Sequence, residues 1–252
     1  MIAGAEAGRI GRALESVACW TSEIIVVLND DVSDGTDRLA ENHGAKVFRE
    51  SWKGYMAQKN SAAAKATQPW LLGLDADEAV SETLRDEITR ALSTPAASEI
   101  FAAFSFPRCT RFCGRWIRHG DWYPDRAVRL WRKGHARWTG AQVHEKLEVS
   151  GHIGKLRADL LHDVSETVDR QIEKIMSYSN AFLLEAQGKQ RPARWWDLGV
   201  RPCWRFVRSY VLRGGFLDGW QGWYIAWMTA FYTATRYAKV RAARADGTPP
   251  AG

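Results

Sequence analysis

The stretch PWLLGLDADEAVS, residues 69–81, decides the fold, because an apolar run ends there in three carboxylates. The run 69–75 predicts a short buried strand, and Asp75, Asp77 and Glu78 stand at its end. Like charges this close repel one another, so an opposite charge, most simply a metal ion, would account for them. The alternative is a polar strand end followed by a helix that is capped at Ser81.

Strand and helix signals alternate on both sides of this stretch. Short apolar or β-branched runs predict strands at 23–29, 46–50 and 69–75. Helices are predicted at 34–45, 54–67 and 81–93. This alternation predicts an α/β fold with a parallel sheet, and ligands bind at the carboxyl ends of such strands. Asp75 and Asp77 stand at one such end, and Asn29, Asp30 and Asp31 stand at another.

The net charge of +6 is unevenly distributed along the 252 residues. Residues 191–252 contain ten Lys or Arg and three Asp or Glu, which leaves the first 190 residues nearly neutral. The four cysteines are too scattered for a disulfide framework and favour a reduced, cytoplasmic setting. Residues 1–12 lack the apolar core of a signal peptide. We therefore expect a near-neutral domain followed by a basic tail.

The basic tail is also rich in aromatic residues. Its arginines recur at helical spacing, at Arg201, Arg205 and Arg208. The uncharged segment 219–235 places four aromatic residues on one helix face, namely Trp220, Trp223, Trp227 and Phe231. At the lower limit of spanning length and interrupted by Gln221 and Gly222, this segment is expected to lie at a membrane interface rather than to cross it. The alternative is a helix packed on the preceding domain.

Several motifs stand in an order that resembles one family. They are GRALESV, EIIVVLNDDVSDGTD, GAKVF, GYMAQKNSAAAKA, WLLGLDADE, GRWIRHGDWYPDRAVRLWRKG, RWTGAQVHEKLEV, LLHD and GFLDGWQGWYIAWMTAFYTATRYAK. Together they cover nearly the whole chain and resemble the family 2 glycosyltransferases, in particular the lipopolysaccharide core β-1,4-glucosyltransferases that act on heptose. The resemblance implies a GT-A fold, Rossmann-like with a mostly parallel sheet flanked by helices, over residues 1–165. A basic, aromatic, membrane-associated helical region is expected over 166–252.

The resemblance also implies how the donor is held. In the family an aspartate pair holds a divalent cation, Mg²⁺ or Mn²⁺, that neutralises the diphosphate leaving group. Asp77 is therefore expected to be the metal ligand, and Asp75 to face the ribose or a water on the metal. Lys59 is expected to meet phosphate, although a solvated helix lysine is the plain alternative. Asn29 and Asp31 are expected to contact the nucleotide.

The acceptor side is expected to carry a general base, because inverting transfer is a single displacement. Asp125 falls where the family carries its base, and Asp121 is the second candidate; either could instead be a turn aspartate beside Pro124. Trp122 and Tyr123 are candidate walls for the acceptor sugar, although a core or surface role is open for both.

A histidine downstream of the acidic pair completes the metal site in many GT-A enzymes. His144 is the first candidate for this role, and His162 competes with it. Glu145 is expected to orient the histidine or to bind the acceptor.

The sequence departs from the family pattern in two places. Asn29 stands where most relatives have Asp, and no apolar strand is visible before the first helix, with Glu6 as a remnant of the nucleotide-contacting turn. The first strand is therefore expected to be missing.

The function implied by the resemblance is metal-dependent, inverting transfer of a hexose. The expected donor is UDP-glucose, and the expected acceptor is a lipopolysaccharide inner-core sugar or a related glycolipid, at the anionic inner face of the cytoplasmic membrane. Transfer to a polyprenyl phosphate and an inactive membrane-associated scaffold are the alternatives. A nucleic-acid-binding protein could use the arginines and aromatics of the tail but would not need the aspartates, so no nucleic-acid partner is expected.

Overall fold

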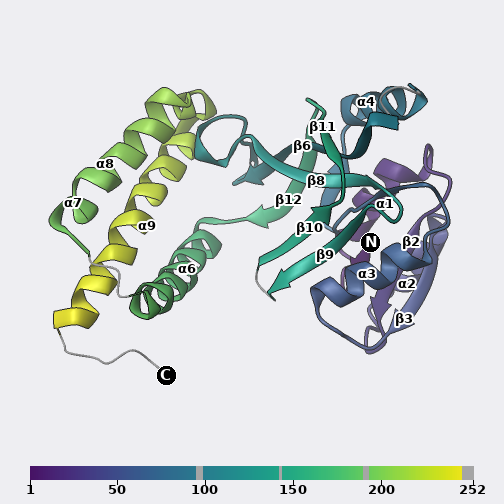
Figure 1. Cartoon of the computed structure of the whole chain (residues 1–252), viewed down its shortest axis with the longest axis horizontal. Helices are drawn as coiled ribbons and strands as arrows, with labels where there is room; N and C mark the ends of the chain where they lie inside the picture. Colours follow the sequence, from purple (N-terminus) through teal and green to yellow (C-terminus); the bar gives the residue numbers. More distant parts are fainter. Residues whose placement is uncertain (95–98, 142–143, 190–192, 246–252) are drawn as a thin grey trace. The chain divides into compact units, whose positions relative to one another are not determined.

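The computed structural model describes residues 1–94, 99–141, 144–189 and 193–245. The chain forms two compact units, and it passes between them more than once (Figure 1). Met1–Cys109 and Asp125–His162 form the first, called here the sheet unit. Thr110–Pro124 and Asp163–Gly252 form the second, called here the helical unit.

The first sheet of the sheet unit is parallel, as the alternation of strands and helices predicts. Its order is β1 (Ile2–Ala3), β2 (Ile25–Asn29) and β3 (Lys46–Glu50). Each strand is followed by a helix, namely α1 (Ile10–Ala18), α2 (Thr36–Asn42) and α3 (Tyr55–Lys65). The buried residues of α1 recur at helical spacing, at Ile10, Ala13, Leu14 and Val17, and join the main core.

The first strand, which we expected to be missing, is present. Ile2 and Ala3 form β1 and pair in parallel with Val27 and Leu28 of β2. The expectation is therefore wrong for the described structure. The run of apolar residues at this point is too short for a strand pattern to show it.

The second sheet is largely antiparallel, which the sequence pattern does not predict. Its main path runs through β4 (Trp70–Leu72), β8 (Asp125–Arg132), β6 (Phe101–Phe112), β12 (Leu160–Glu166) and β5 (Glu78–Val80). Strand β11 (His152–Lys155) lies parallel to β6, while β9 (Ala136–Ala141) and β10 (His144–Val149) form a separate antiparallel pair. The α/β class is confirmed.

The stretch 69–81 therefore contains two short strands with an acidic turn between them. The helix that follows, α4 (Glu82–Ser93), begins at Ser81, whose Oγ accepts a hydrogen bond from the backbone N–H of Leu84 at 3.2 Å. The capped helix is thus real. It starts after the acids, and so it does not account for Asp75 and Asp77.

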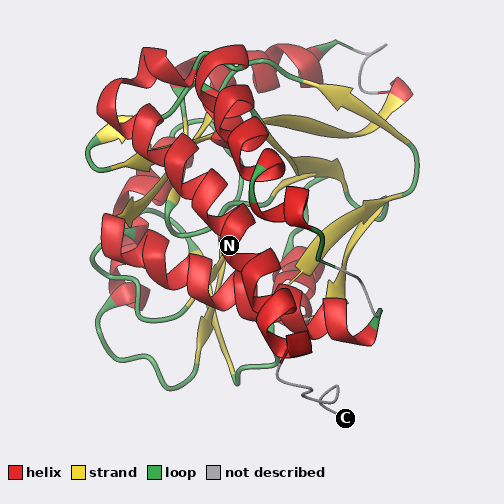
Figure 2. Cartoon of the chain, turned by 90° about the vertical axis from the view of Figure 1, so that its left-hand side faces the viewer, coloured by secondary structure: helices red, strands yellow, loops and turns green. Residues whose placement is uncertain are grey.

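The helical unit contains most of the C-terminal part of the chain. Its elements are β7 (Arg115–Trp116), η1 (Gly120–Trp122), α6 (Val168–Gly188), α7 (Trp195–Leu198), α8 (Val200–Val207), the π-helical η2 (Arg208–Leu212), η3 (Gly215–Asp218) and α9 (Gly219–Ala245). Helices α8 and α9 run alongside each other (Figures 1 and 2). Gly222 permits the tight turn before α9, because a Cβ there would lie 1.8 Å from the carbonyl oxygen of Gly215.

No helix within the described ranges is long and apolar enough to cross a membrane.

Candidate active site

A cleft of about 700 Å³ opens in the sheet unit at the ends of β2 and β4. It is lined by six of the residues that the sequence singles out, namely Asn29, Asp31, Lys59, Asp75, Asp77 and Glu145. Glu6, Arg9, Trp52, Tyr55 and His162 line it as well. Because the carboxyl ends of neighbouring strands meet at one edge, residues far apart in sequence gather there.

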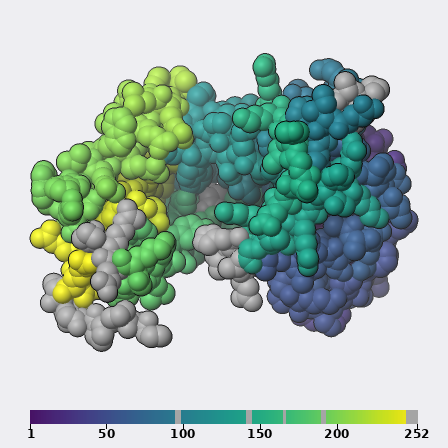
Figure 3. Space-filling model, in the orientation of Figure 1, coloured from purple at the N-terminus to yellow at the C-terminus, as the bar shows by residue number. Residues whose placement is uncertain are grey.

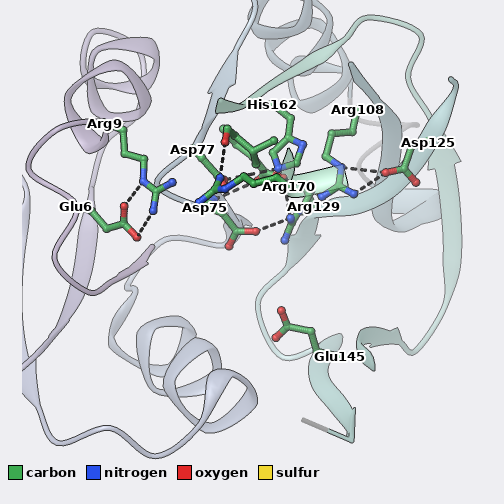
Figure 4. Close-up of polar contacts among 12 residues, drawn as sticks. Glu6, Arg9, Asp75, Asp77, Arg108, Asp125, Arg129, Glu145, His162 and Arg170 are labelled. Carbon is green, nitrogen blue, oxygen red and sulfur yellow. Dashed lines mark hydrogen bonds and ion pairs between the residues drawn. The ribbon is translucent and has the colours of Figure 1, made fainter. Parts of the chain in front are cut away.

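Asp75 is held between two cations of the protein, Arg129 and Lys59, of which Figure 4 shows Arg129. Its carboxylate accepts a hydrogen bond from Arg129 at 2.6 Å, and Lys59 Nζ lies 3.2 Å away on the other oxygen. Burial alone would raise the pKa of Asp75, but Arg129 and Lys59 outweigh it and hold that pKa well below its ordinary value. Asp75 is therefore a fixed, ionised acceptor.

Glu78 lies behind Asp75 and shares the same arginine. Its Oε1 accepts from Arg129 at 2.7 Å, and its Oε2 accepts from the backbone N–H of Asp75 at 3.1 Å. Burial raises the pKa of Glu78, and the charge of Arg129 opposes the rise. A terminal nitrogen of Arg108 lies 3.7 Å from the same oxygen, Oε1. Glu78 thus joins two guanidinium groups beneath the cleft.

Lys59 links α3 to the β9–β10 pair. Its Nζ donates to Glu145 Oε1 at 2.9 Å and lies 4.6 Å from the ring centre of Trp138. Only 10% of the Lys59 side chain is exposed. The ammonium group is therefore not a solvated helix lysine: it lies at the cleft wall among two carboxylates and an indole ring.

Asp77 also lines the cleft, beside His162. Its Oδ1 lies 3.8 Å from Nε2 of His162, and its side chain is 24% exposed. Strand β12 brings His162 to this point, because His162 pairs with Glu78 across the antiparallel β12–β5 pair. Burial lowers the pKa of His162, and Arg108 adds to the effect, so the imidazole is held towards its neutral, ligating form.

The donor set at Asp77 fits a hard divalent cation only in part. Within the described ranges, no group of three or more His, Cys, Asp or Glu side chains is arranged to hold a metal ion. Mg²⁺ often takes only one or two carboxylates from a protein, while waters and substrate phosphates complete its shell, and Asp77 offers one such carboxylate with His162 beside it. The backbone of His144 begins β10, but its side chain lies outside what the structure describes.

Two unsatisfied acceptors mark the cleft as a polar binding site. Asn29 Oδ1 and Glu145 Oε2 are buried and have no hydrogen-bond partner among the described residues. Such atoms cost free energy unless a ligand or water satisfies them. Trp52 and Tyr55 stand at the same cleft as an exposed edge-to-face pair, with ring centres 4.8 Å apart.

Asp125 lies at the end of the charge network and is not among the residues that line the cleft. Arg108 contacts its Oδ2 through Nε at 3.0 Å and through a terminal nitrogen at 2.5 Å. With 47% of its side chain exposed, Asp125 remains open to solvent. Arg108, Glu78 and Arg129 thus connect Asp125 to Asp75 in a row of alternating positive and negative side chains.

Asp121 and Trp122 belong to the helical unit. The carboxylate of Asp121 lies 3.2 Å from Arg205, 3.8 Å from Arg208 and 3.1 Å from Arg213, and only 7% of the side chain is exposed. Trp122 packs edge-to-face against Phe112 at 5.5 Å.

Sequence reasoning missed the cations that organise the site. Arg129 stands in the strand motif RAVRLW, where two arginines flank apolar residues and nothing distinguishes a buried one. Arg9 stands in the turn before α1, paired with Glu6 through its Nε and through a terminal nitrogen at 3.2 Å.

Comparisons with known proteins place the chain in one family. Residues 1–147 match the family model described as glycosyl transferase family 2. The lipopolysaccharide core biosynthesis glycosyltransferase LpsC of Rhizobium meliloti (strain 1021) is 28% identical over 247 residues, covering 92% of this chain and 90% of LpsC. An uncharacterized glycosyltransferase of Rickettsia prowazekii (strain Madrid E) is 28% identical over 253 residues, covering 94% of this chain and 83% of its own.

Among solved structures, S. aureus TarS 1-349 in complex with UDP-GlcNAc is similar with a TM-score of 0.49 and 13% identity. That match covers 98% of this chain and 90% of the TarS chain. The family match covers more than half of the chain, including every residue that lines the cleft except His162. The chain belongs to glycosyltransferase family 2.

Proposed function

We propose that this glycosyltransferase moves a hexose, glucose from UDP-glucose first among the candidates, to a lipopolysaccharide inner-core sugar or a related glycolipid, with inversion. The observation that carries the proposal is the cleft in which Asp75 and Asp77 meet Asn29, Lys59 and His162. The name of the R. meliloti relative, a lipopolysaccharide core biosynthesis glycosyltransferase, supports the acceptor class.

The nucleotide would occupy the part of the cleft beside β2. Asn29 presents a buried, unpaired amide oxygen there, which suits an N–H donor on a base edge. Asp31 and Asp75 offer side-chain oxygens to ribose hydroxyls, and Lys59 brings a positive charge towards the diphosphate.

Asp77 and His162 would hold a divalent cation, Mg²⁺ or Mn²⁺. When bound, the cation would neutralise the negative charge that develops on the diphosphate leaving group. His162 replaces His144 as the first candidate here, because its Nε2 lies 3.8 Å from Asp77. His144 remains the alternative ligand.

Asp125 would act as the general base. Its carboxylate would accept the proton of the acceptor hydroxyl while that oxygen bonds to the anomeric carbon and the bond to the diphosphate breaks. Arg108 would hold the carboxylate in place. Asp121 is the weaker candidate, because its buried carboxylate is surrounded by three guanidinium groups.

The acceptor contacts assigned by resemblance remain part of the proposal. Glu145 lines the cleft with a buried, unpaired Oε2 that suits a sugar hydroxyl. Trp122 would form an aromatic wall for the acceptor. A glycolipid acceptor also implies that the protein works peripherally at the inner face of the cytoplasmic membrane.

A transfer assay tests the proposal directly. Labelled UDP-glucose is offered with a heptose-terminated core oligosaccharide, and in parallel with polyprenyl phosphate. We expect label in the oligosaccharide, and we expect Asp125→Asn to lower kcat by a factor of about 10² to 10⁴ while the KM for the donor stays the same. Label in polyprenyl phosphate alone would contradict the acceptor class, and an unchanged kcat would exclude Asp125 as the base.

A further inference from the structure

The helical unit exposes an apolar face on two adjoining helices. On α8 and η2 this face consists of Val200, Trp204, Val207 and Val211, each 41–56% exposed. On α9 it consists of Trp220, Trp223, Trp227 and Phe231, each 47–56% exposed. Both sets recur at intervals of three and four residues, so each forms one stripe along its helix. These eight residues are called here the apolar face.

The turn between the two helices also exposes large apolar side chains. Leu212, Phe216 and Leu217 are 51–63% exposed at the end of η2 and in η3. Ring contacts join the two sides, because Phe206 of α8 lies 6.2 Å from Trp227 of α9, and Tyr210 of η2 lies 6.2 Å from Phe216. Helix α8 and this turn form the light green surface in Figure 3. Soluble proteins rarely expose so many large apolar side chains together unless a partner covers them.

Arginines flank the apolar stripe of α8. Arg201, Arg205 and Arg208 lie about 40–100° round the helix from Trp204, on the side away from Phe206. The side chains of these three arginines and of Arg213 are 32–48% exposed. The apolar stripe therefore has a cationic border on one side.

The acids that could neutralise this border are buried. Residues 193–245 contain two acids, Asp197 and Asp218, which are 3% and 2% exposed. Arg201 Nε lies 2.6 Å from Asp197, and Asp218 accepts from the backbone N–H groups of Arg118 and His119. Asp121 of η1, which is 7% exposed, lies among Arg205, Arg208 and Arg213. Two buried carboxylates, Asp121 and Asp197, thus face four partly exposed guanidinium groups, and the exposed side chains of this border are cationic.

We propose that the apolar face inserts in the plane of an anionic lipid bilayer, with the arginines at the phosphate level. Tryptophan and arginine suit this boundary, because the indole ring prefers the interface and the guanidinium group binds lipid phosphate. The absence of a spanning helix among the described residues fits insertion in the plane. The inference deepens the proposed function, from which it takes the glycolipid acceptor, and names the surface that meets the lipid.

Vesicle flotation of the full chain tests the inference. The probes are phosphatidylcholine vesicles with and without phosphatidylglycerol, at low and high salt. We expect flotation with the anionic vesicles that weakens with salt. Trp204→Ser combined with Trp227→Ser should lower the partition coefficient roughly tenfold or more, and Arg213→Gln should lower it about fivefold. Ile153→Ser, which removes an apolar side chain of similar exposure from β11 of the sheet unit, should leave it unchanged.

The controls make each outcome decisive. Circular dichroism establishes that each variant is folded, and quenching of tryptophan fluorescence by brominated lipid reports insertion independently, with less quenching expected in the tryptophan variant. No flotation of the folded wild type, or equal flotation of the tryptophan variant, would overturn the inference. So would a dimer in sedimentation that the tryptophan variant abolishes, because a second copy would then cover the face. None of these measurements needs nucleotide or acceptor, so their failure is distinct from failure of the transfer assay.

Discussion

Lys59 Nζ lies 2.9 Å from Glu145 Oε1, although the two residues are 86 positions apart in the chain. Lys59 also lies 3.2 Å from Asp75, so one ammonium group serves two carboxylates. The contact joins the helix after β3 to the β9–β10 pair at the wall of the cleft. A single charged group thereby couples the two halves of the candidate site.

This coupling predicts a non-additive double-mutant cycle. In urea unfolding, Lys59→Met and Glu145→Gln should each lower the free energy of unfolding. The decrease in the double variant should be smaller than the sum of the two single decreases. The interaction energy should be about 0.5–3 kcal/mol, because both groups are largely buried in one network. Lys189 and Glu185, a pair at 2.6 Å whose side chains are 70% and 61% exposed, provide a control with a small coupling energy. Additive losses at Lys59 and Glu145 would show that the contact is weak in solution.

Arg129→Met is expected to be severely destabilising. The substitution would leave Asp75 and Glu78 without their shared cation beneath the cleft, and breaking such a buried pair costs about 3–5 kcal/mol. Adding Glu78→Gln to Arg129→Met should restore part of the loss, since it removes one uncompensated carboxylate. Arg126→Met on the same strand is the control, because Arg126 donates to the backbone carbonyls of Ser105 and Leu156. Equal losses for the two arginine variants would contradict this account.

The contacts of Glu50 predict that the folded state loses part of its stability at acidic pH. Lys65 first and Ser61 second lower the pKa of Glu50 to about 2, because both bond to its carboxylate. A depressed carboxylate pKa stabilises the folded state above the unfolded pKa, near 4.5, and the benefit is lost as the pH falls towards 2. Melting temperatures should therefore fall less steeply over this pH range in Glu50→Gln than in wild type.

The control for this measurement is Glu41→Gln, which replaces an exposed glutamate of α2. Its melting curve should keep the wild-type slope over the same pH range. A wild-type slope in Glu50→Gln as well would mean that Glu50 does not hold α3 against β3.

Asp121 predicts a different effect, within the helical unit. Asp121→Asn would remove the carboxylate that lies among Arg205, Arg208 and Arg213 and leave three like charges together. We expect a loss of about 1–3 kcal/mol in unfolding free energy. This is less than for a fully buried pair, because the arginines are partly exposed to solvent. Sulfate should restore part of it by binding between the guanidinium groups. A stability equal to wild type in low salt would contradict the structural role of Asp121.

The sequence predicts the half of the site that follows the strands of the N-terminal part. Asn29, Lys59, Asp75 and Asp77 line one cleft, as the alternation of strands and helices predicts. The expected parallel pairing holds for β2 and β3, but it is wrong for β4, which belongs to the second sheet and pairs antiparallel with β8. The two-residue β1 escapes the same reasoning, since its apolar run is too short to stand out.

The other half depends on antiparallel pairing, which local patterns do not specify. Arg129 reaches Asp75 because β8 pairs with β4, and His162 reaches Asp77 because β12 pairs with β5. Neither partner choice leaves a signal in the residues themselves. The order of motifs therefore identifies the family, the acids, Lys59 and His162 as a candidate, while the role of Arg129 and the choice of His162 over His144 beside Asp77 depend on the fold.

The most direct test of the central claim is calorimetric titration of UDP into the purified chain, with Mn²⁺ and without it. Binding should require the metal in the wild type and should lose that requirement, or fail, in Asp77→Asn. Asp86→Asn, which replaces an exposed aspartate of α4, should behave as wild type. Unchanged metal-dependent binding in Asp77→Asn, or no binding of UDP by the folded wild type, would contradict the assignment of this cleft as a metal-assisted sugar-nucleotide site.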